Sequence, residues 1–410
     1  MWYNPKMTEE TKRRISGFDN VIRVLANEDK NTFLRVANSL FRVAPEEITR
    51  YDYDVDGKTW SVWESPGWKT VCDAGKTYNE FFDKETGFTC RFGRTVKEDP
   101  DYCQLGPSIA DIEIVAGKCP KVNGKNCAFC YKSNGGETAN CMTLAEFKEL
   151  LDFLPRNLCQ IAFGITGYYT NPDFPAMIEY AKSKGVVCNY TTNGVDLDEK
   201  AITHTVDNCG RIAVSCYEGA KDICYRTLSR VGEIAAVKGK KFPCNIHVVL
   251  SKATFGHVMS VLEDAKDGKI ANLGAIVILR IKPVGRAANL DCVIPDEMYD
   301  EIVRYCFDNK IRFGFDSCGA KKVADVLVRL GKTDLISCVE PCESSRFSSY
   351  WNWKREYWNC SFCENNKTVM EAADMFRFND FQSFWNSDEI RKVRFPEKRA
   401  CASCPWYSLD

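Results

Sequence analysis

Histidine is scarce in this sequence, since His204, His247 and His257 are the only three in 410 residues. Any metal site must therefore be built mainly from thiolates, which favour zinc or iron–sulfur clusters. Long apolar runs are also missing: no stretch of about 18 apolar residues occurs, and Met1–Lys12 has no apolar signal-peptide core. We therefore expect a cytoplasmic protein that is neither exported nor inserted in a membrane.

An excess of either charge is missing too, because 55 Lys and Arg stand against 56 Asp and Glu and the net charge is −1. This balance gives no electrostatic reason to expect nucleic acid or an acidic membrane as a partner. Cysteine, in contrast, is abundant, with 22 residues. In a reducing compartment so many thiols indicate metal or redox chemistry rather than a disulfide framework.

Between residues 108 and 315, short apolar runs alternate with stretches of helical spacing. Each run is short enough for a buried strand, and parallel neighbours need crossover helices. Six such β/α units predict an α/β fold, a partial (β/α)6 TIM-like barrel. The expected strands are 109–115, 160–164, 186–190, 211–215, 245–250 and 275–281, with a seventh at 311–315. The expected helices are 143–154, 174–184, 198–207, 255–265 and 295–308.

Composition divides the chain into three expected regions. Residues 1–105 are rich in charge and aromatics, show little periodicity beyond a predicted helix at 31–43, and receive no role. Residues 106–320 form the barrel. Residues 321–410 form an irregular, cysteine-rich C-terminal extension with few helical runs before 381–393, and we expect it to depend on metal more than on a large apolar core.

Three cysteines follow the first expected strand on one loop, in the segment GKCPKVNGKNCAFCY of residues 117–131. Three thiolates can bind three irons of a [4Fe–4S] cluster and leave the fourth iron open to a small-molecule ligand. One alternative is a structural zinc site, which would need a fourth ligand such as Cys141. The other is a set of unreactive core cysteines.

This loop resembles the cysteine motif of the radical S-adenosylmethionine (SAM) superfamily, in which a CxxxCxxC loop follows the first strand of a partial β/α barrel. Phe129 fills the superfamily's aromatic position before the last cysteine, but seven residues instead of three separate the first two cysteines. The resemblance implies that Cys119, Cys127 and Cys130 hold a [4Fe–4S] cluster and that SAM chelates its open iron.

Further strand ends resemble SAM-binding elements of the same superfamily. Gly164 and Gly167 stand where it has Gly-Gly-Glu; the glutamate is absent, but the glycines keep a permissive backbone whose carbonyls would bind the SAM amino group. By the same resemblance, Thr192, Asn193 and Ser215 face the ribose or carboxylate of SAM. Local hydrogen bonding in a turn is the alternative for each of these three.

The last two strand ends carry charged residues. The segment IKPVGR of residues 281–286 looks like a KPxGR element of relatives, and Lys282 or Arg286 could pair with an anion there or form a structural salt bridge. After the seventh strand, Asp316 could act as a base, and Cys318 as a hydrogen-atom donor or cluster ligand. A turn with a buried thiol is the alternative.

A second group of cysteines lies in the C-terminal extension. Its pattern resembles the shortened SPASM, or twitch, extension of radical SAM proteins, which holds an auxiliary [4Fe–4S] cluster. Because no further cysteine follows the final pair, one auxiliary cluster is expected. The implied ligands are Cys342, Cys360, Cys401 and Cys404.

The ligand set and the metal of this second group stay open. Cys363 is an alternative ligand, and the pattern does not decide whether Cys338 or Cys318 takes part. Zinc is the alternative metal, since the CxxC pairs at 360–363 and 401–404 also form a Cys₄ zinc pattern.

The resemblance implies that the reduced cluster passes one electron to SAM and that the resulting 5′-deoxyadenosyl radical removes a hydrogen atom from a substrate. Relatives with an auxiliary cluster mostly modify peptides or protein side chains. We therefore expect an oxidoreductase of peptide maturation that uses an external one-electron reductant such as flavodoxin or ferredoxin. The alternatives are a radical SAM dehydrogenase acting on a small sugar or nucleotide-like substrate and a non-catalytic, zinc-stabilised binding protein.

Overall fold

A nine-stranded sheet forms the centre of the protein in this computed structural model, which describes residues 47–95, 98–339, 342–365 and 370–395. The strand order is β14-β13-β12-β11-β10-β9-β6-β15-β16. From β14 to β15 neighbouring strands run parallel, and β16 is antiparallel to β15. The strands are β6 (Ile109–Glu113), β9 (Gln160–Gly164), β10 (Val187–Thr192), β11 (Cys209–Ser215), β12 (Cys244–Leu250), β13 (Leu273–Arg280), β14 (Phe313–Phe315), β15 (Ser348–Trp351) and β16 (Tyr357–Trp358).

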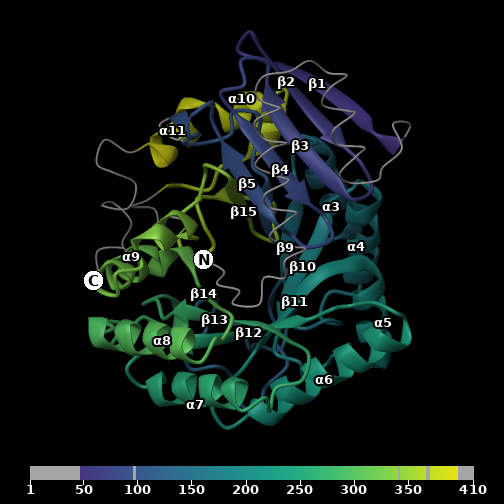
Figure 1. The fold of residues 1–410 in the computed structure, drawn as a ribbon. Coiled ribbons are helices and arrows are strands. Elements are labelled where there is room, and N and C mark those ends of the chain that lie inside the picture. The colour runs from purple at the N-terminus through teal and green to yellow at the C-terminus, as the bar shows by residue number, and fades with distance from the viewer. Residues whose placement is uncertain (1–46, 96–97, 340–341, 366–369, 396–410) are drawn as a thin grey trace.

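Helices follow one another in an arc around one face of this sheet (Figure 1). They are α3 (Leu144–Phe153), α4 (Phe174–Ser183), α5 (Glu199–Asn208), α6 (Lys221–Val237), α7 (Phe255–Lys266), α8 (Asp296–Asp308) and α9 (Ala320–Arg329). The expected α/β class with a large parallel sheet is therefore confirmed. No ladder joins β14 to β16 within the described residues, so closure into a partial barrel stays a prediction.

Helix α3 begins where its sequence signal places it. Thr143 Oγ1 accepts a hydrogen bond from the Glu146 amide at 3.3 Å, and the Glu146 carboxylate accepts one from the Thr143 amide at 2.8 Å. This reciprocal pair is a capping box, which satisfies two amides that the helix leaves without partners. The apolar stripe of α3 then packs against the sheet through Phe147, Leu150 and Leu151.

Residues 49–92 form a second sheet, an antiparallel meander that the sequence analysis did not anticipate. Asp56 and Gly57, both with positive φ, make the two-residue turn between its first strands. Nearly every residue of the central strand of the meander, β3, is buried. This strand therefore lacks the alternation of buried and exposed residues that would have marked it in the sequence. The strands are β1 (Thr49–Val55), β2 (Lys58–Glu64), β3 (Trp68–Asp73), β4 (Asn79–Asp83) and β5 (Thr89–Phe92). The helix expected at 31–43 lies outside the described residues.

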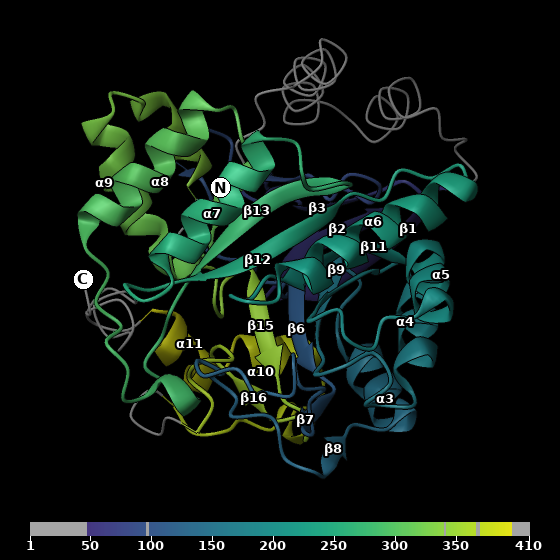
Figure 2. The same cartoon turned by 90° about the horizontal axis from the view of Figure 1, so that it is seen from below.

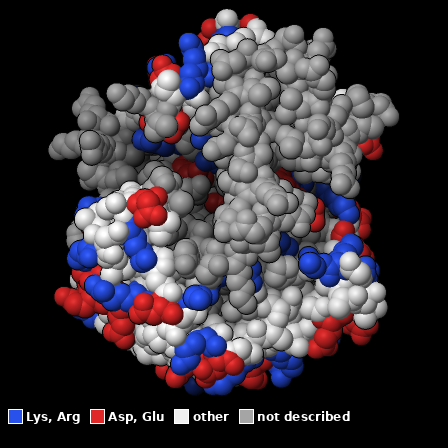
Figure 3. All heavy atoms as spheres, viewed as in Figure 1, with Lys and Arg blue, Asp and Glu red and all other residues white. Residues whose placement is uncertain are grey.

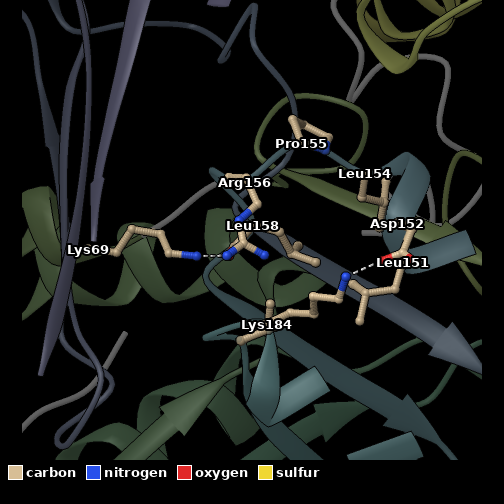
Figure 4. A pocket seen from close by; sticks show the side chains of 9 residues that line it. Lys69, Leu151, Asp152, Leu154, Pro155, Arg156, Leu158 and Lys184 are labelled. Carbon is tan, nitrogen blue, oxygen red and sulfur yellow. Dashed lines mark hydrogen bonds and ion pairs between the residues drawn. The ribbon is translucent and has the colours of Figure 1, made fainter. Parts of the chain in front are cut away.

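A cluster of charged side chains joins this meander to the central sheet (Figure 4). Lys69, fully buried in β3, donates to the Leu158 carbonyl at 2.6 Å and lies 3.5 Å from the Glu64 carboxylate. Lys184 pairs with Asp152 at 2.6 Å in the same pocket. Because these charges have partners, we interpret the pocket as part of the contact between the two sheets.

The C-terminal extension joins the central sheet directly, since β15 lies beside β6 (Figure 2). Among its described residues, the α-helices after α9 are α10 (Phe381–Trp385) and α11 (Asp388–Arg394), so the helical run expected at 381–393 is split. The expectation that this extension has little apolar core is wrong for its described part. Several of its large aromatic side chains are almost fully buried and continuous with the main core, among them Trp351, Tyr357, Phe381, Phe384 and Trp385.

The division into regions 1–105, 106–320 and 321–410 stays a prediction. Acidic and basic side chains mingle over the described surface seen in Figure 3, in keeping with the balanced composition. No helix in the described ranges combines the length and apolar character that crossing a membrane requires.

Candidate functional site

The loop that carries the first three cysteines is fixed at both ends by a short antiparallel pair, β7 (Val115–Gly117) and β8 (Ala139–Cys141). Gly117 has a positive φ of 92°, and its amide donates to Asn134 Oδ1 at 2.8 Å. A Cβ on Gly117 would lie 2.4 Å from the Thr138 carbonyl. Only glycine therefore lets the two ends of the loop approach this closely.

The loop rests on segments that follow the carboxyl ends of the parallel strands. The Cys119 thiol lies 3.6 Å from the carbonyl oxygen of Thr166, which follows β9. Asn193, which follows β10, donates from Nδ2 to the Pro120 carbonyl at 2.9 Å. This is the edge of a parallel sheet where ligand sites collect in α/β proteins.

Two more strand ends hold the other half of the loop. The rings of Phe129 and Tyr217, which follows β11, have centroids 6.0 Å apart. Arg286, which follows β13, donates from Nε to the Cys127 carbonyl at 2.7 Å and from its amide to the Cys130 carbonyl at 3.0 Å. The predicted Arg286 therefore holds the loop backbone in this structure.

The three loop thiols are free, partly buried and close to one another. Burial, followed by the charges of Cys127 and Cys130, raises the pKa of Cys119 to about 11. Burial also raises the pKa of Cys127. In the described ranges, however, no group of three or more His, Cys, Asp or Glu side chains is arranged to hold a metal ion. The structure thus gathers the thiols without displaying a finished metal site.

Cys141, the fourth ligand that zinc would need, points elsewhere. Its thiol donates to the Thr170 carbonyl at 3.6 Å. Its pKa is raised by burial and then by Asp173, and no loop thiol contributes to the shift. The geometry gives no support to a zinc site completed by Cys141.

Gly164 and Gly167 occupy crowded positions. Neither has a positive φ, so the permissive backbone expected of them is not used. A Cβ on Gly164 would lie 2.9 Å from Glu113 Cα, and one on Gly167 would lie 2.6 Å from Pro120 Cγ. Both positions require glycine because of space, and Gly167 does so directly beneath the cysteine loop.

Thr192 and Asn193 form a turn after β10. Thr192 Oγ1 accepts from the Gly194 amide at 3.0 Å, and Asn193 Oδ1 accepts from the Val195 amide at 3.0 Å. Ser215, at the end of β11, helps to set the pKa of the buried Tyr217 phenol, which burial and then Cys127 raise. The SAM contacts assigned to Thr192, Asn193 and Ser215 stay predictions.

Lys282 and Asp316 form a buried ion pair at 2.5 Å. Lys282 also donates to the Arg280 carbonyl at 2.9 Å. Burial opposes the charge of Lys282, but Asp316 and Cys318 together outweigh burial, and the pKa of the ammonium is raised. For Lys282 the sequence allowed either an anion partner or a structural salt bridge, and the structure shows a salt bridge. Its partner is Asp316, the residue that the sequence analysis named as a possible base.

Part of the second cysteine group lies near this ion pair. The Cys363 amide donates to the Cys360 carbonyl at 3.0 Å, and the Cys363 thiol and then burial raise the pKa of Cys360. Burial also raises the pKa of Cys318, with smaller effects that include those of Cys342 and Cys360. The side chain of Cys338, and the whole of Cys401 and Cys404, lie outside the described residues.

The sequence analysis missed a cluster of charges between the two cysteine groups. Lys132 lies 3.1 Å from the Glu113 carboxylate and also contacts the Glu364 carboxylate, while the Tyr350 hydroxyl donates to Glu364 at 2.8 Å. The sequence did contain a signal for this cluster of charges: Lys132 stands two residues after Cys130, and Glu364 directly follows Cys363.

Asp111 is a second missed residue. It alternates with Glu113 on β6, on the face opposite the buried Ala110 and Ile112. Burial, followed by the charge of Glu343, raises its pKa to about 7. It makes no hydrogen bond or ion pair with any described residue. A carboxyl with these properties can exchange a proton near neutral pH.

No protein-family model and no curated protein matches the sequence. Among solved structures, Streptococcus suis SuiB bound to the precursor peptide SuiA is similar, with a TM-score of 0.56 and 12% identity over 74% of this chain and 71% of that chain. SuiB bound to S-adenosylmethionine gives a TM-score of 0.56 and 11% identity over 74% of this chain and 72% of that chain. The chain therefore shares its fold with SuiB, a protein that has been crystallised with S-adenosylmethionine and with a precursor peptide.

Proposed function

We propose that this chain is a radical SAM enzyme that modifies a peptide or protein side chain. One observation carries the proposal: the loop with Cys119, Cys127 and Cys130 lies across segments that follow the carboxyl ends of four parallel strands. The fold shared with SuiB, which binds SAM and a precursor peptide, supports it.

The three loop cysteines fit a [4Fe–4S] cluster because they are free thiols, lie close together and leave one iron open. When bound, the cluster would supply the electron that cleaves SAM. The chain's own residues position the loop: Arg286 and Asn193 bind its carbonyls, and Gly167 leaves space beneath Pro120. The Phe129 and Tyr217 rings pack against each other and join the loop to the segment after β11.

For the second cysteine group we propose an auxiliary [4Fe–4S] cluster with ligands among Cys342, Cys360, Cys401 and Cys404, and with Cys363, Cys338 and Cys318 as alternatives. Cys318 lies near Cys342 and Cys360, and this grouping of thiols supports a cluster site in this part of the extension. A flavodoxin or ferredoxin would deliver the electrons, and the reaction would be an oxidation in peptide maturation.

The proposed function is tested with protein reconstituted anaerobically with iron and sulfide. Replacing Cys119, Cys127 and Cys130 together with Ala should abolish formation of 5′-deoxyadenosine from SAM after reduction with dithionite. It should also lower iron by about four per chain, the content of one cube. Cys141→Ala is the matched control, because this thiol lies on β8 and bonds elsewhere.

Wild-type rates of 5′-deoxyadenosine formation in the triple variant would overturn the proposal. Stoichiometric zinc without acid-labile sulfide in the native protein would instead favour the zinc-stabilised binding protein.

A further inference from the structure

We infer that the C-terminal extension holds the first cysteine loop in place through Lys132 and Glu364, so that the conformation of this loop depends on the position of the extension. The inference rests on the proposed function in treating the segment 119–130 as the loop that binds the catalytic cluster. The link itself consists of this chain's own side chains.

An ionic contact joins the two loops. The Lys132 ammonium lies between the carboxylates of Glu113, at the end of β6, and Glu364, in the extension. The Tyr350 hydroxyl on β15 lies 3.2 Å from the Glu113 carboxylate and 2.8 Å from that of Glu364. Asn352 Nδ2 donates to the other Glu364 oxygen at 3.0 Å. Three separate segments thus meet at one lysine.

Burial makes this contact strong. The side chains of Lys132 and Glu364 are each 14% exposed, and that of Glu113 is 6% exposed. Removing one member of a buried ion pair leaves an uncompensated charge in a poorly solvated place, which costs far more than the loss of a surface pair. Without Glu364, Lys132 would keep Glu113 as a partner but lose the carboxylate that connects it to the extension.

An aromatic contact joins the same two loops. Tyr131, directly after Cys130, has its ring centroid 4.5 Å from that of Phe362. Phe362 stands between Cys360 and Cys363 in sequence, and the Lys282 ammonium lies 4.2 Å from its ring centroid. The CxxC turn of the extension is thus packed against the end of the first cysteine loop.

Strand pairing sets the geometry of both contacts. β15 pairs with β6 so that Tyr350 stands opposite Asp111, and its side chain shares the face of Glu113. A shift of one residue would turn Tyr350 to the helix-covered face and break the link. The position of the extension and the conformation of the cysteine loop are therefore coupled.

The test measures backbone amide exchange in the full-length, metal-free chain. Glu364→Gln should make amides in residues 127–132 exchange about tenfold faster or more, the effect expected from losing a hydrogen bond to a charged group. Glu149→Gln is the matched control, because Glu149 of α3 also pairs with an extension residue, Arg355, but does so on the exposed surface. It should leave exchange in 127–132 unchanged.

Tyr350→Phe is a milder second variant. It removes the hydroxyl that bridges Glu113 and Glu364 but keeps the ring, whose centroid lies 4.8 Å from the Lys132 ammonium. It should accelerate exchange in the same segment to a smaller extent with an unchanged unfolding temperature.

Unchanged exchange at 127–132 in a folded Glu364→Gln variant would overturn the inference, as would equal acceleration in Glu149→Gln. Because the chain is metal-free in this experiment, its outcome does not depend on whether the protein cleaves SAM. A failure of the inference and a failure of the proposed function are therefore distinguishable.

Discussion

At the scale of single residues, Asp111 gives the protein a titration near neutral pH. Its pKa is about 7 in the folded protein and 3.8 in the absence of the fold. At a pH between these two pKa values, Asp111 is mostly protonated in the folded chain and mostly ionised in the unfolded chain. The free energy of unfolding therefore falls as the pH rises from about 4 to 7, by at most about 1.4 kcal/mol per pH unit.

Asp111→Asn should remove this dependence. Compared with wild type, the variant should be similar in unfolding temperature near pH 4 and higher at pH 7 to 8, because the asparagine carries no charge to desolvate. Thermal unfolding of the metal-free protein over this pH range measures the difference. Asp222→Asn, on the exposed surface of α6, is the control and should shift the whole curve evenly. A pH-independent difference for Asp111→Asn would contradict the assignment.

Substitution at Gly167 should lower SAM affinity far more than substitution at Thr166. Gly167→Val would drive its side chain into Pro120 and Asp196, displace the cysteine loop and sharply lower SAM affinity. Thr166→Val removes a buried hydroxyl that has no hydrogen-bond partner in the described part of the chain, and it should change affinity only modestly and stability by less than about 1 kcal/mol. Calorimetric titration with SAM ranks the two, and the reverse ranking would show that the Thr166 hydroxyl binds the ligand.

At the scale of elements, the aromatic core changes what is expected of the C-terminal extension. Cys401→Ala plus Cys404→Ala should lower iron by about four per chain. Residues 348–365 and 370–395 should nevertheless stay resistant to protease, because Trp351, Phe384 and Trp385 are buried without these cysteines. Phe384→Ala is the contrasting variant: it should cost about 3–5 kcal/mol and expose the extension to cleavage. Complete proteolysis of the extension in the double cysteine variant would show that metal, and not packing, holds it.

The elements that the sequence predicted are those with strong local signals. β9 covers the expected residues 160–164, and α3 begins at its capping box. α6 was missed although it is 17 residues long, and its N-cap residue, Ala220, has no side chain that could cap the helix. β15 has only four residues, and its partner strand lies 240 positions earlier, so no local pattern announces it.

At the scale of the whole molecule, the candidate site was predictable only where its residues follow one another in sequence. The three cysteines share one loop, and Arg286 and Asn193 stand in short motifs at strand ends. Lys132 and Glu364 are 232 positions apart, and only the pairing of β15 with β6 brings them together. Asp111 was hidden for a different reason, because the alternation of Asp111 and Glu113 in β6 does not reveal whether the face that they share is buried.

The pairing of β15 with β6 also has a consequence for the time course of biosynthesis. The ribosome adds about 5–20 residues per second, so the 240 positions between the paired strands take about 10–50 s to synthesise. Throughout that interval one edge of β6 in the nascent chain has no partner, and Lys132 has no Glu364 to bind. The cysteine loop can reach its final conformation only after Glu364 has been synthesised, and metal delivered earlier would meet thiols on a chain that is still growing.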